Sequence, residues 1–206
     1  KGVIKQNDLP TGCCNILVSP DGERTMATHI GIGSQLHPDE LSEDSLQGID
    51  HIYMESYLWD HDLTKQTLKK VGKIAKAMNI ETSLSLSDPF CVDRHRDELK
   101  EFIEEYVDLV FCNFDEAKMF AQSETMADVS SFFQSFGKKI AMTASAEGAY
   151  YFHGETVAHQ PAQKIEQVID TTGAGDNFAA GFLDQYLSDK TIDEALAQGN
   201  ARAGEV

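Results

Sequence analysis

IDTTGAGDNFAAGFL, residues Ile169 to Leu183, joins the end of an apolar run to a helical pattern through two closely spaced glycines. Glycine lets the backbone turn tightly and bring free N–H groups up to an anion. The N-terminus of the helix expected over residues 175–187 adds a favourable potential for negative charge. The stretch therefore predicts a turn in which a phosphoryl group can sit.

Asp176 follows the second glycine and stands at the edge of this anion site. A carboxylate there can take the proton of a hydroxyl that attacks a phosphorus atom. The alternative is structural, since acidic residues are common in a first helical turn because they stabilise it. If only Gly-x-Gly-Asp were present, the structural role of Asp176 would be the better interpretation. The complete stretch from Ile169 to Leu183 favours the catalytic role.

Outward from this stretch, strand and helix patterns alternate along most of the chain. Strands are expected over 49–54, 80–86, 107–112 and 139–143, helices over 63–78, 93–106, 115–121, 127–136 and 192–203, and hairpins over 13–30 and 149–158, with Val168 leading into the glycine stretch. Repeated strand-helix-strand units predict an α/β fold with a central, mostly parallel sheet and helices on both faces.

The stretch resembles the ribokinase-like carbohydrate and nucleoside kinases, also called the PfkB family, whose fold is a three-layer α/β domain with a hairpin lid. The resemblance implies that Asp176 is the catalytic base. It also implies that Gly173, Ala174 and Gly175 form the anion hole, and it places Thr172 with the nucleotide. ATP would be the phosphoryl donor.

Asn113-Phe-Asp-Glu116 follows an apolar strand and resembles the Asn-x-x-Glu motif of that family. The resemblance implies that it organises Mg²⁺ and the phosphates. Glu116 is a hard oxygen ligand for Mg²⁺, held directly or through water, and Asn113 can donate to a phosphate oxygen. The structural alternative is a helix N-cap followed by a solvated acid, which would lead if the motif stood alone.

Residues 143–148, Thr-Ala-Ser-Ala-Glu-Gly, fall where the family usually carries Thr-x-Gly-x-x-Gly, a turn that lines the nucleotide. The resemblance implies nucleotide contacts from Thr143, Ser145 and Gly148. Ser145 replaces the first glycine of the motif. If that position needs a positive φ or a close backbone approach to phosphate, serine costs affinity or alters the geometry.

The predicted lid hairpin over residues 11–30 carries Arg24 just after its turn. In the family an arginine in such a segment reaches the active site, so Arg24 is expected to offset charge on the transferred phosphoryl group. The alternative, an arginine exposed on an edge hairpin without a role in the reaction, has equal weight.

Asp88 lies in a segment similar to the adenosine-kinase-like branch. It is a phosphate-side or metal-organising candidate, although Asp before Pro is also an ordinary turn.

The amino-acid composition limits the kinds of molecule that this chain can bind. Hydrophobic residues make up 41% of the 206 and the formal charge is −17, with 34 acidic against 17 basic side chains. The electrostatic field of this excess negative charge repels nucleic acid and anionic membranes. Three of the cysteines, Cys13, Cys14 and Cys112, lie in apolar, strand-like runs, so they are expected to be buried in a cytoplasmic protein. A homodimer stays an open alternative to a monomer.

Together these features predict one partial ribokinase-like domain over residues 1–206 that moves the γ-phosphoryl group of ATP to a primary hydroxyl of a sugar or nucleoside. The segment that grips the acceptor in this family, and the end of the family's domain, are expected to lie outside these residues. Adenosine-like and ribose- or fructose-like acceptors both stay open. The rival hypothesis is a non-catalytic nucleotide-binding or subunit-interaction protein that keeps the fold.

Overall fold

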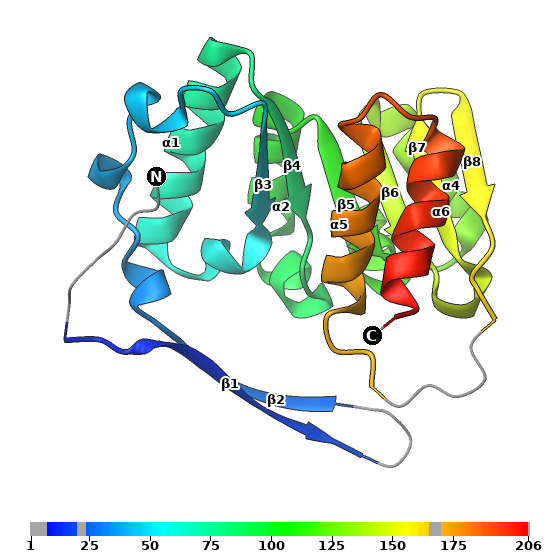
Figure 1. The fold of residues 1–206 in the computed structure, drawn as a ribbon, viewed down its shortest axis with the longest axis horizontal. Coiled ribbons are helices and arrows are strands. Elements are labelled where there is room, and N and C mark those ends of the chain that lie inside the picture. Colours follow the sequence, from blue (N-terminus) through cyan, green and yellow to red (C-terminus); the bar gives the residue numbers. More distant parts are fainter. Residues whose placement is uncertain (1–7, 20–23, 165–169, 206) are drawn as a thin grey trace.

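A six-stranded sheet forms the centre of the computed structural model, which describes residues 8–19, 24–164 and 170–205 (Figure 1). The strands lie in sequence order: β3 (His51–Glu55), β4 (Glu81–Ser85), β5 (Leu109–Asn113), β6 (Lys139–Thr143), β7 (Ala149–His153) and β8 (Thr156–Gln160). Strands β3 to β6 pair in parallel, whereas β7 and β8 are antiparallel. The predicted α/β class is confirmed, with a hairpin at one edge of the parallel part.

Helices cover both faces of this sheet, as Figure 1 shows. One face carries α1 (Asp62–Met78), α2 (Pro89–Tyr106), α3 (Phe114–Ala121) and α4 (Met126–Phe136), and the other carries α5 (Ala174–Tyr186) and α6 (Ile192–Ala203). Short 3₁₀ helices are η1 (Ile32–Gln35), η2 (Pro38–Glu40), η3 (Glu43–Leu46), η4 (Ser56–Asp60) and η5 (Ser145–Glu147). Within the described residues, no helix has both the length and the apolar character needed to cross a bilayer.

Alternation along the buried strands explains why there are two cores. In β5, Leu109 and Phe111 pack with α5 and α6, whereas Val110 and Cys112 face the core under α1 to α4. Successive side chains of a strand point to opposite faces, so a strand that is apolar at every position is covered on both sides. The apolar run predicted at 107–112 is therefore the middle of a three-layer sandwich.

The first hairpin stands apart from this sandwich. Strands β1 (Thr11–Val18) and β2 (Arg24–Gly31) form their own two-stranded antiparallel sheet, which extends from the body in Figure 1. Every residue of β1 is exposed. The expectation that Cys13 and Cys14 are buried is wrong, because neither face of this hairpin is covered within the described residues, whereas Cys112 is buried as expected.

One expectation at an element boundary also changes. Helix α2 begins at Pro89 rather than near residue 93, because Asp88 caps it and Pro fits the first helical turn. The turn of the first hairpin (20–22) and the segment at Val168 lie outside the described residues. The remaining predicted strands and helices agree with the structure to within a few residues.

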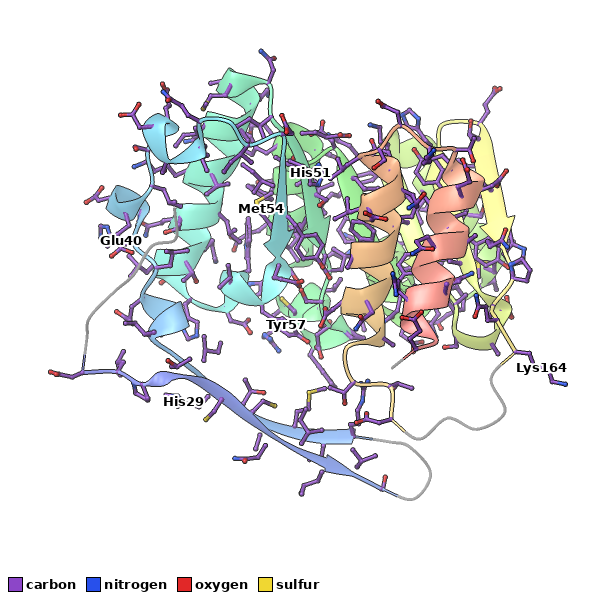
Figure 2. All side chains as sticks on the ribbon, viewed as in Figure 1. His29, Glu40, His51, Met54, Tyr57 and Lys164 are labelled. Atoms are coloured by element: carbon purple, nitrogen blue, oxygen red, sulfur yellow. The ribbon has the colours of Figure 1, made fainter. Side chains whose placement is uncertain are left out.

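A buried histidine marks the amino end of β3, far from Tyr57 at the other end of the sheet (Figure 2). The His51 side chain is only 6% exposed, and its Nε2 lies 2.8 Å from the Ser83 hydroxyl. Its Nδ1 is buried without a hydrogen-bond partner. Burial lowers the pKa of His51 from its ordinary value, against the opposing charges of Glu81 and Asp108, while Lys139 lowers it further.

The free energy of unfolding should consequently fall as the pH drops below about 6.5. The unfolded chain then binds a proton at His51 that the folded chain resists, so this stability is fully present above the unfolded pKa and is lost in acid. In urea titrations between about pH 5 and pH 8, His51→Gln should reduce the fall in the free energy of unfolding on the acid side. The exposed His153→Gln serves as the control, and an equal effect of both variants would contradict the prediction.

Candidate active site

The carboxyl ends of the parallel strands carry several of the polar side chains singled out by sequence, together with Glu55, which was not. Glu55 ends β3, Asp88 follows β4, and the Asn113 and Thr143 positions pair in register at the ends of β5 and β6. This edge of the sheet faces the β1–β2 hairpin in Figure 1. In open α/β sheets this edge is where ligands bind.

The glycine turn opens helix α5 in the way the sequence predicts. Gly173 is the N-cap with a left-handed φ of 79°, and no side chain caps the helix there. The backbone N–H of Asn177 and its side-chain amide both donate to the Gly173 carbonyl at 2.9 Å. A Cβ built on Gly175 would meet nothing within 4 Å. The helix start is therefore ordered by its own backbone and leaves room for an anion.

Asp176 lies exposed in the first turn of α5. Its charge reaches β3, where it contributes to the raised pKa values of Glu55 and Tyr53, although burial is the larger cause in both. Two carboxylates from distant parts of the chain thus meet at one edge. A solvent-accessible aspartate beside an open anion turn has the placement that a general base needs.

Close packing fixes α5 and with it Asp176. Phe178 and Phe182 contact the edge of the Phe111 ring, with ring centroids 6.4 Å and 5.5 Å away. On the other side a Cβ at Gly199 would lie 2.7 Å from the Phe178 ring, so α6 approaches as closely as glycine allows. The catalytic candidate therefore stands on a rigid support.

Arg24 lies near the segment that leads into the glycine turn. Thr172 donates to the Asp170 carboxylate through its hydroxyl at 2.6 Å and its backbone N–H at 2.8 Å. These hydrogen bonds lower the pKa of Asp170, and the positive charge of Arg24 contributes to the same shift. The hairpin thus brings its arginine towards the predicted active site, while the hydroxyl proton of Thr172 is engaged locally.

Asn113 and Glu116 form a reciprocal cap at the start of α3. The Asn113 side chain accepts from the Glu116 backbone N–H at 2.8 Å, and Glu116 accepts from the Asn113 backbone N–H at 2.9 Å and from its amide at 2.6 Å. The capping part of the structural alternative is correct. The solvated acid is not, since Glu116 is only 5% exposed.

Burial is the main cause that raises the pKa of Glu116 to about 7; the charges of Asp88, Glu55 and Asp115 act in the same direction, and the hydrogen bond from the Asn113 backbone N–H opposes them. A cation near this carboxylate would relieve that cost. The described residues contain no group of three acidic, histidine or cysteine side chains that could hold a metal by themselves. This donor set fits Mg²⁺, which commonly takes one or two carboxylates and completes its shell with water and substrate phosphates.

Asp88 has a structural task in this fold. Its Oδ1 accepts from the backbone N–H groups of Phe90 at 2.7 Å and Cys91 at 3.3 Å, which caps α2. Its charge still adds to the field at Glu116. The structure therefore supports the turn interpretation of Asp88 directly and leaves its second carboxylate oxygen for the site.

The turn after β6 has a positive φ at both positions where the family motif carries glycine. Ser145 has a φ of 47°, in the left-handed region that glycine adopts without steric strain. Gly148 has a φ of 96°, and a Cβ there would lie 2.1 Å from the Gln160 carbonyl oxygen. Serine thus replaces glycine at a position that does need a positive φ, and Gly148 is required by space as well as by φ.

The structure adds three residues to the candidate site that the sequence interpretation missed: Tyr53, Glu55 and Ser87. The Ser87 hydroxyl donates to the Glu55 carboxylate at 2.6 Å, and Tyr53 helps to counter the rise in the pKa of Glu55. One signal was available, since Glu55 and Ser87 both lie just past apolar strand patterns whose carboxyl ends must meet. Their pairing across two strands, however, was not readable from spacing.

The carboxyl edge of this α/β fold thus carries an open glycine turn, an exposed carboxylate beside it and a second acid nearby. The sequence matches the pfkB family carbohydrate kinase profile over residues 1–206. The chain belongs to this family.

Similar proteins agree with this assignment. An adenosine kinase from Sinorhizobium meliloti is 38% identical with a TM-score of 0.90, over 95% of this chain and 60% of that one. A probable sugar kinase from Rhizobium etli CFN 42 is 34% identical with a TM-score of 0.91, over 97% and 61%. Adenosine kinase 2 of Arabidopsis thaliana is 26% identical over 95% of this chain. This chain spans 61% of that relative's length.

Proposed function

We propose that the protein containing this chain transfers the γ-phosphoryl group of ATP to a hydroxyl of a nucleoside or sugar. The observation that carries the proposal is the exposed Asp176 at the start of α5, beside an open glycine turn and close to Glu55. Family membership supports the reaction class.

In the proposed reaction Asp176 takes the proton of the acceptor hydroxyl as its oxygen attacks the phosphorus. The backbone N–H groups of residues 173–175 hold the phosphoryl oxygens, helped by the helix dipole, and Arg24 offsets negative charge from the hairpin side. Glu55 accepts a hydrogen bond from a neighbouring hydroxyl of the acceptor. These groups act by position and charge and form no covalent bond to the substrate.

Mg²⁺, when bound, would neutralise charge on the ATP phosphates. Glu116 is the residue proposed to hold it, directly or through water, and Asn113 keeps both Glu116 oxygens oriented. Thr143, Ser145 and Gly148 are proposed to line the nucleotide, and Thr172 to support the phosphate turn through Asp170. With a formal charge of −17, the chain needs such local groups to bind ATP.

The acceptor class is proposed as a nucleoside, with adenosine first. The similarity to the Sinorhizobium meliloti adenosine kinase supports this choice, and the probable sugar kinase at comparable identity keeps ribose and fructose as alternatives. A cytoplasmic reaction is proposed with it, as expected from the sequence.

The test is phosphorylation by the full-length protein. It should be incubated with Mg-ATP and, separately, with adenosine, cytidine, ribose and fructose, and the product followed by mass spectrometry. Formation of one phosphorylated product at a catalytic rate supports the proposal. ATP turnover that is unaffected by every acceptor would overturn it.

Removing the metal should abolish this activity. We expect EDTA to stop turnover and Mg²⁺ to restore it, and Glu116→Gln to raise the Mg²⁺ concentration for half-maximal rate by about tenfold, since a charged oxygen ligand is lost. Initial rates over a Mg²⁺ series at saturating acceptor measure this. Glu124→Gln, at an exposed acid just after the same helix, is the matched control. Equal Mg²⁺ curves for wild type and Glu116→Gln would show that Glu116 serves only as a helix cap.

A further inference from the structure

Ser87 is the hub of a hydrogen-bond cluster at the carboxyl edge. Its hydroxyl donates to Glu55 Oε2 at 2.6 Å, with the Ser85 carbonyl as a more distant acceptor at 3.2 Å, and it accepts from the Ser56 backbone N–H at 3.0 Å. Its own backbone N–H donates to the Ser85 hydroxyl at 3.1 Å. One side chain thus ties the end of β3 to the loop after β4.

The loop around Ser87 is bound to the β3 side at two further points. The Tyr57 hydroxyl donates to the Ser87 carbonyl at 3.0 Å, and the buried Ser56 hydroxyl donates to the Leu86 carbonyl at 2.6 Å. These bonds hold the Ser87 carbonyl and amide in one orientation. The cluster therefore determines the backbone at Ser87 independently of the Ser87 side chain.

Ser87 has a φ of 65°, which is uncommon for a residue with a Cβ. Residues kept in such conformations cluster at ligand sites and persist because their surroundings over-determine them. Glycine would meet the backbone requirement of this position without strain. The serine supplies what glycine lacks, a hydroxyl aimed at Glu55.

We infer that Ser87 is a positioning residue of the proposed kinase reaction: its hydroxyl holds the Glu55 carboxylate towards Asp176, ready to accept a hydrogen bond from the phosphoryl acceptor. This inference rests on the proposed function. It adds a residue that does not touch the substrate and acts through Glu55 alone.

The electrostatics of the edge explain why Glu55 needs such support. Burial raises the pKa of Glu55, and the nearby Asp176 raises it further, while the hydrogen bonds from Ser87 and Tyr53 oppose the rise. The charge of Glu55 also contributes to the raised pKa of Glu116 on α3. Protonation would turn one Glu55 oxygen into a donor and remove the negative charge that makes the carboxylate a strong acceptor, and reorientation would turn its oxygens away.

The decisive variant is Ser87→Gly in the full-length protein, because it removes the hydroxyl and tolerates the same φ. The KM for the acceptor should rise about tenfold, and the KM for Mg-ATP by less than about twofold, since the lost bond acts on the acceptor side. The acid limb of the pH profile of kcat/KM should move to higher pH. Ser87→Asn should recover part of the loss, because asparagine tolerates a positive φ and keeps a donor.

A second measurement does not depend on activity. The carboxyl carbon of Glu55, assigned by comparison with Glu55→Gln, can be titrated by NMR in the wild type and in Ser87→Gly. Its midpoint should rise in the variant. Asn79→Gly is the control, because Asn79 also has a positive φ but lies at the amino edge of the sheet, next to β4.

An unchanged Glu55 midpoint in Ser87→Gly would overturn the inference, and so would equal rises of KM for acceptor and Mg-ATP. A shifted midpoint with the selective KM effect supports it. If the wild type phosphorylates no acceptor, the proposed function fails together with the role of Ser87 in it, and the NMR midpoint still shows whether Ser87 controls Glu55.

Discussion

Asp176→Asn should lower the kcat of the full-length protein by about 10²-fold or more, the scale of a lost general base, with less than about threefold change in KM for ATP. The residue stands in the first turn of α5, exposed and beside an open glycine turn. Asparagine keeps the shape and the helix start but cannot accept the proton. Steady-state rates with saturating acceptor and Mg-ATP measure the effect.

The control is Asp184→Asn, at an exposed acid of the same helix farther from the glycine turn. It should leave kcat near the wild-type value, since Asp184 hydrogen-bonds its helix neighbour Gln185. Both variants should melt within a few degrees of the wild type. Near-normal kcat in a folded Asp176→Asn protein would remove the base from the proposed mechanism.

Gly148→Ala should destabilise the protein by about 3 kcal/mol, or roughly 10 °C in melting temperature. The new Cβ would lie 2.1 Å from the Gln160 carbonyl oxygen and 2.5 Å from the Ala162 nitrogen, and backbone atoms cannot rotate away. The φ of 96° adds strain for any residue with a Cβ. Because this turn is proposed to line the nucleotide, the KM for ATP should rise as well.

Gly137→Ala separates the two causes in this prediction. Gly137 also has a positive φ, 76°, but a Cβ there would meet nothing within 4 Å. It should cost only about 1 kcal/mol, the penalty for a left-handed alanine. Differential scanning fluorimetry measures both melting temperatures. Equal values for the two variants would show that the backbone at Gln160 moves away from the new Cβ without loss of stability.

The site was predictable where its residues are close in sequence. The Asn113 and Glu116 pair and the glycine turn at residues 173–175 are local features, because caps and tight turns form between residues a few positions apart. The sequence also flagged Ser145 as a departure, and its φ of 47° gives the reason that it matters. The roles of these residues towards ligands remain proposals.

Contacts between distant segments escaped the sequence. Glu55 ends β3 and Ser87 lies in the loop after β4, and the charge of Asp176 acts on Glu55 from a helix much farther along the chain. The burial of Glu116, with its pKa near 7, depends on the packing of α3 and could not be distinguished from a solvated acid beforehand. Cys13 and Cys14 were expected to be buried and are exposed, because an apolar strand pattern does not reveal whether anything covers the strand.

By itself the sequence determined the α/β class, the order of strands and helices, and the glycine turn with its aspartate, because periodicity, caps and glycine positions are written into short windows of the chain. Only the tertiary structure decided which acids share one edge, which of them are buried, and which serine holds Glu55. Those properties depend on the distances between elements that the sheet brings together, and electrostatic energies and hydrogen bonds follow distance and burial rather than sequence separation.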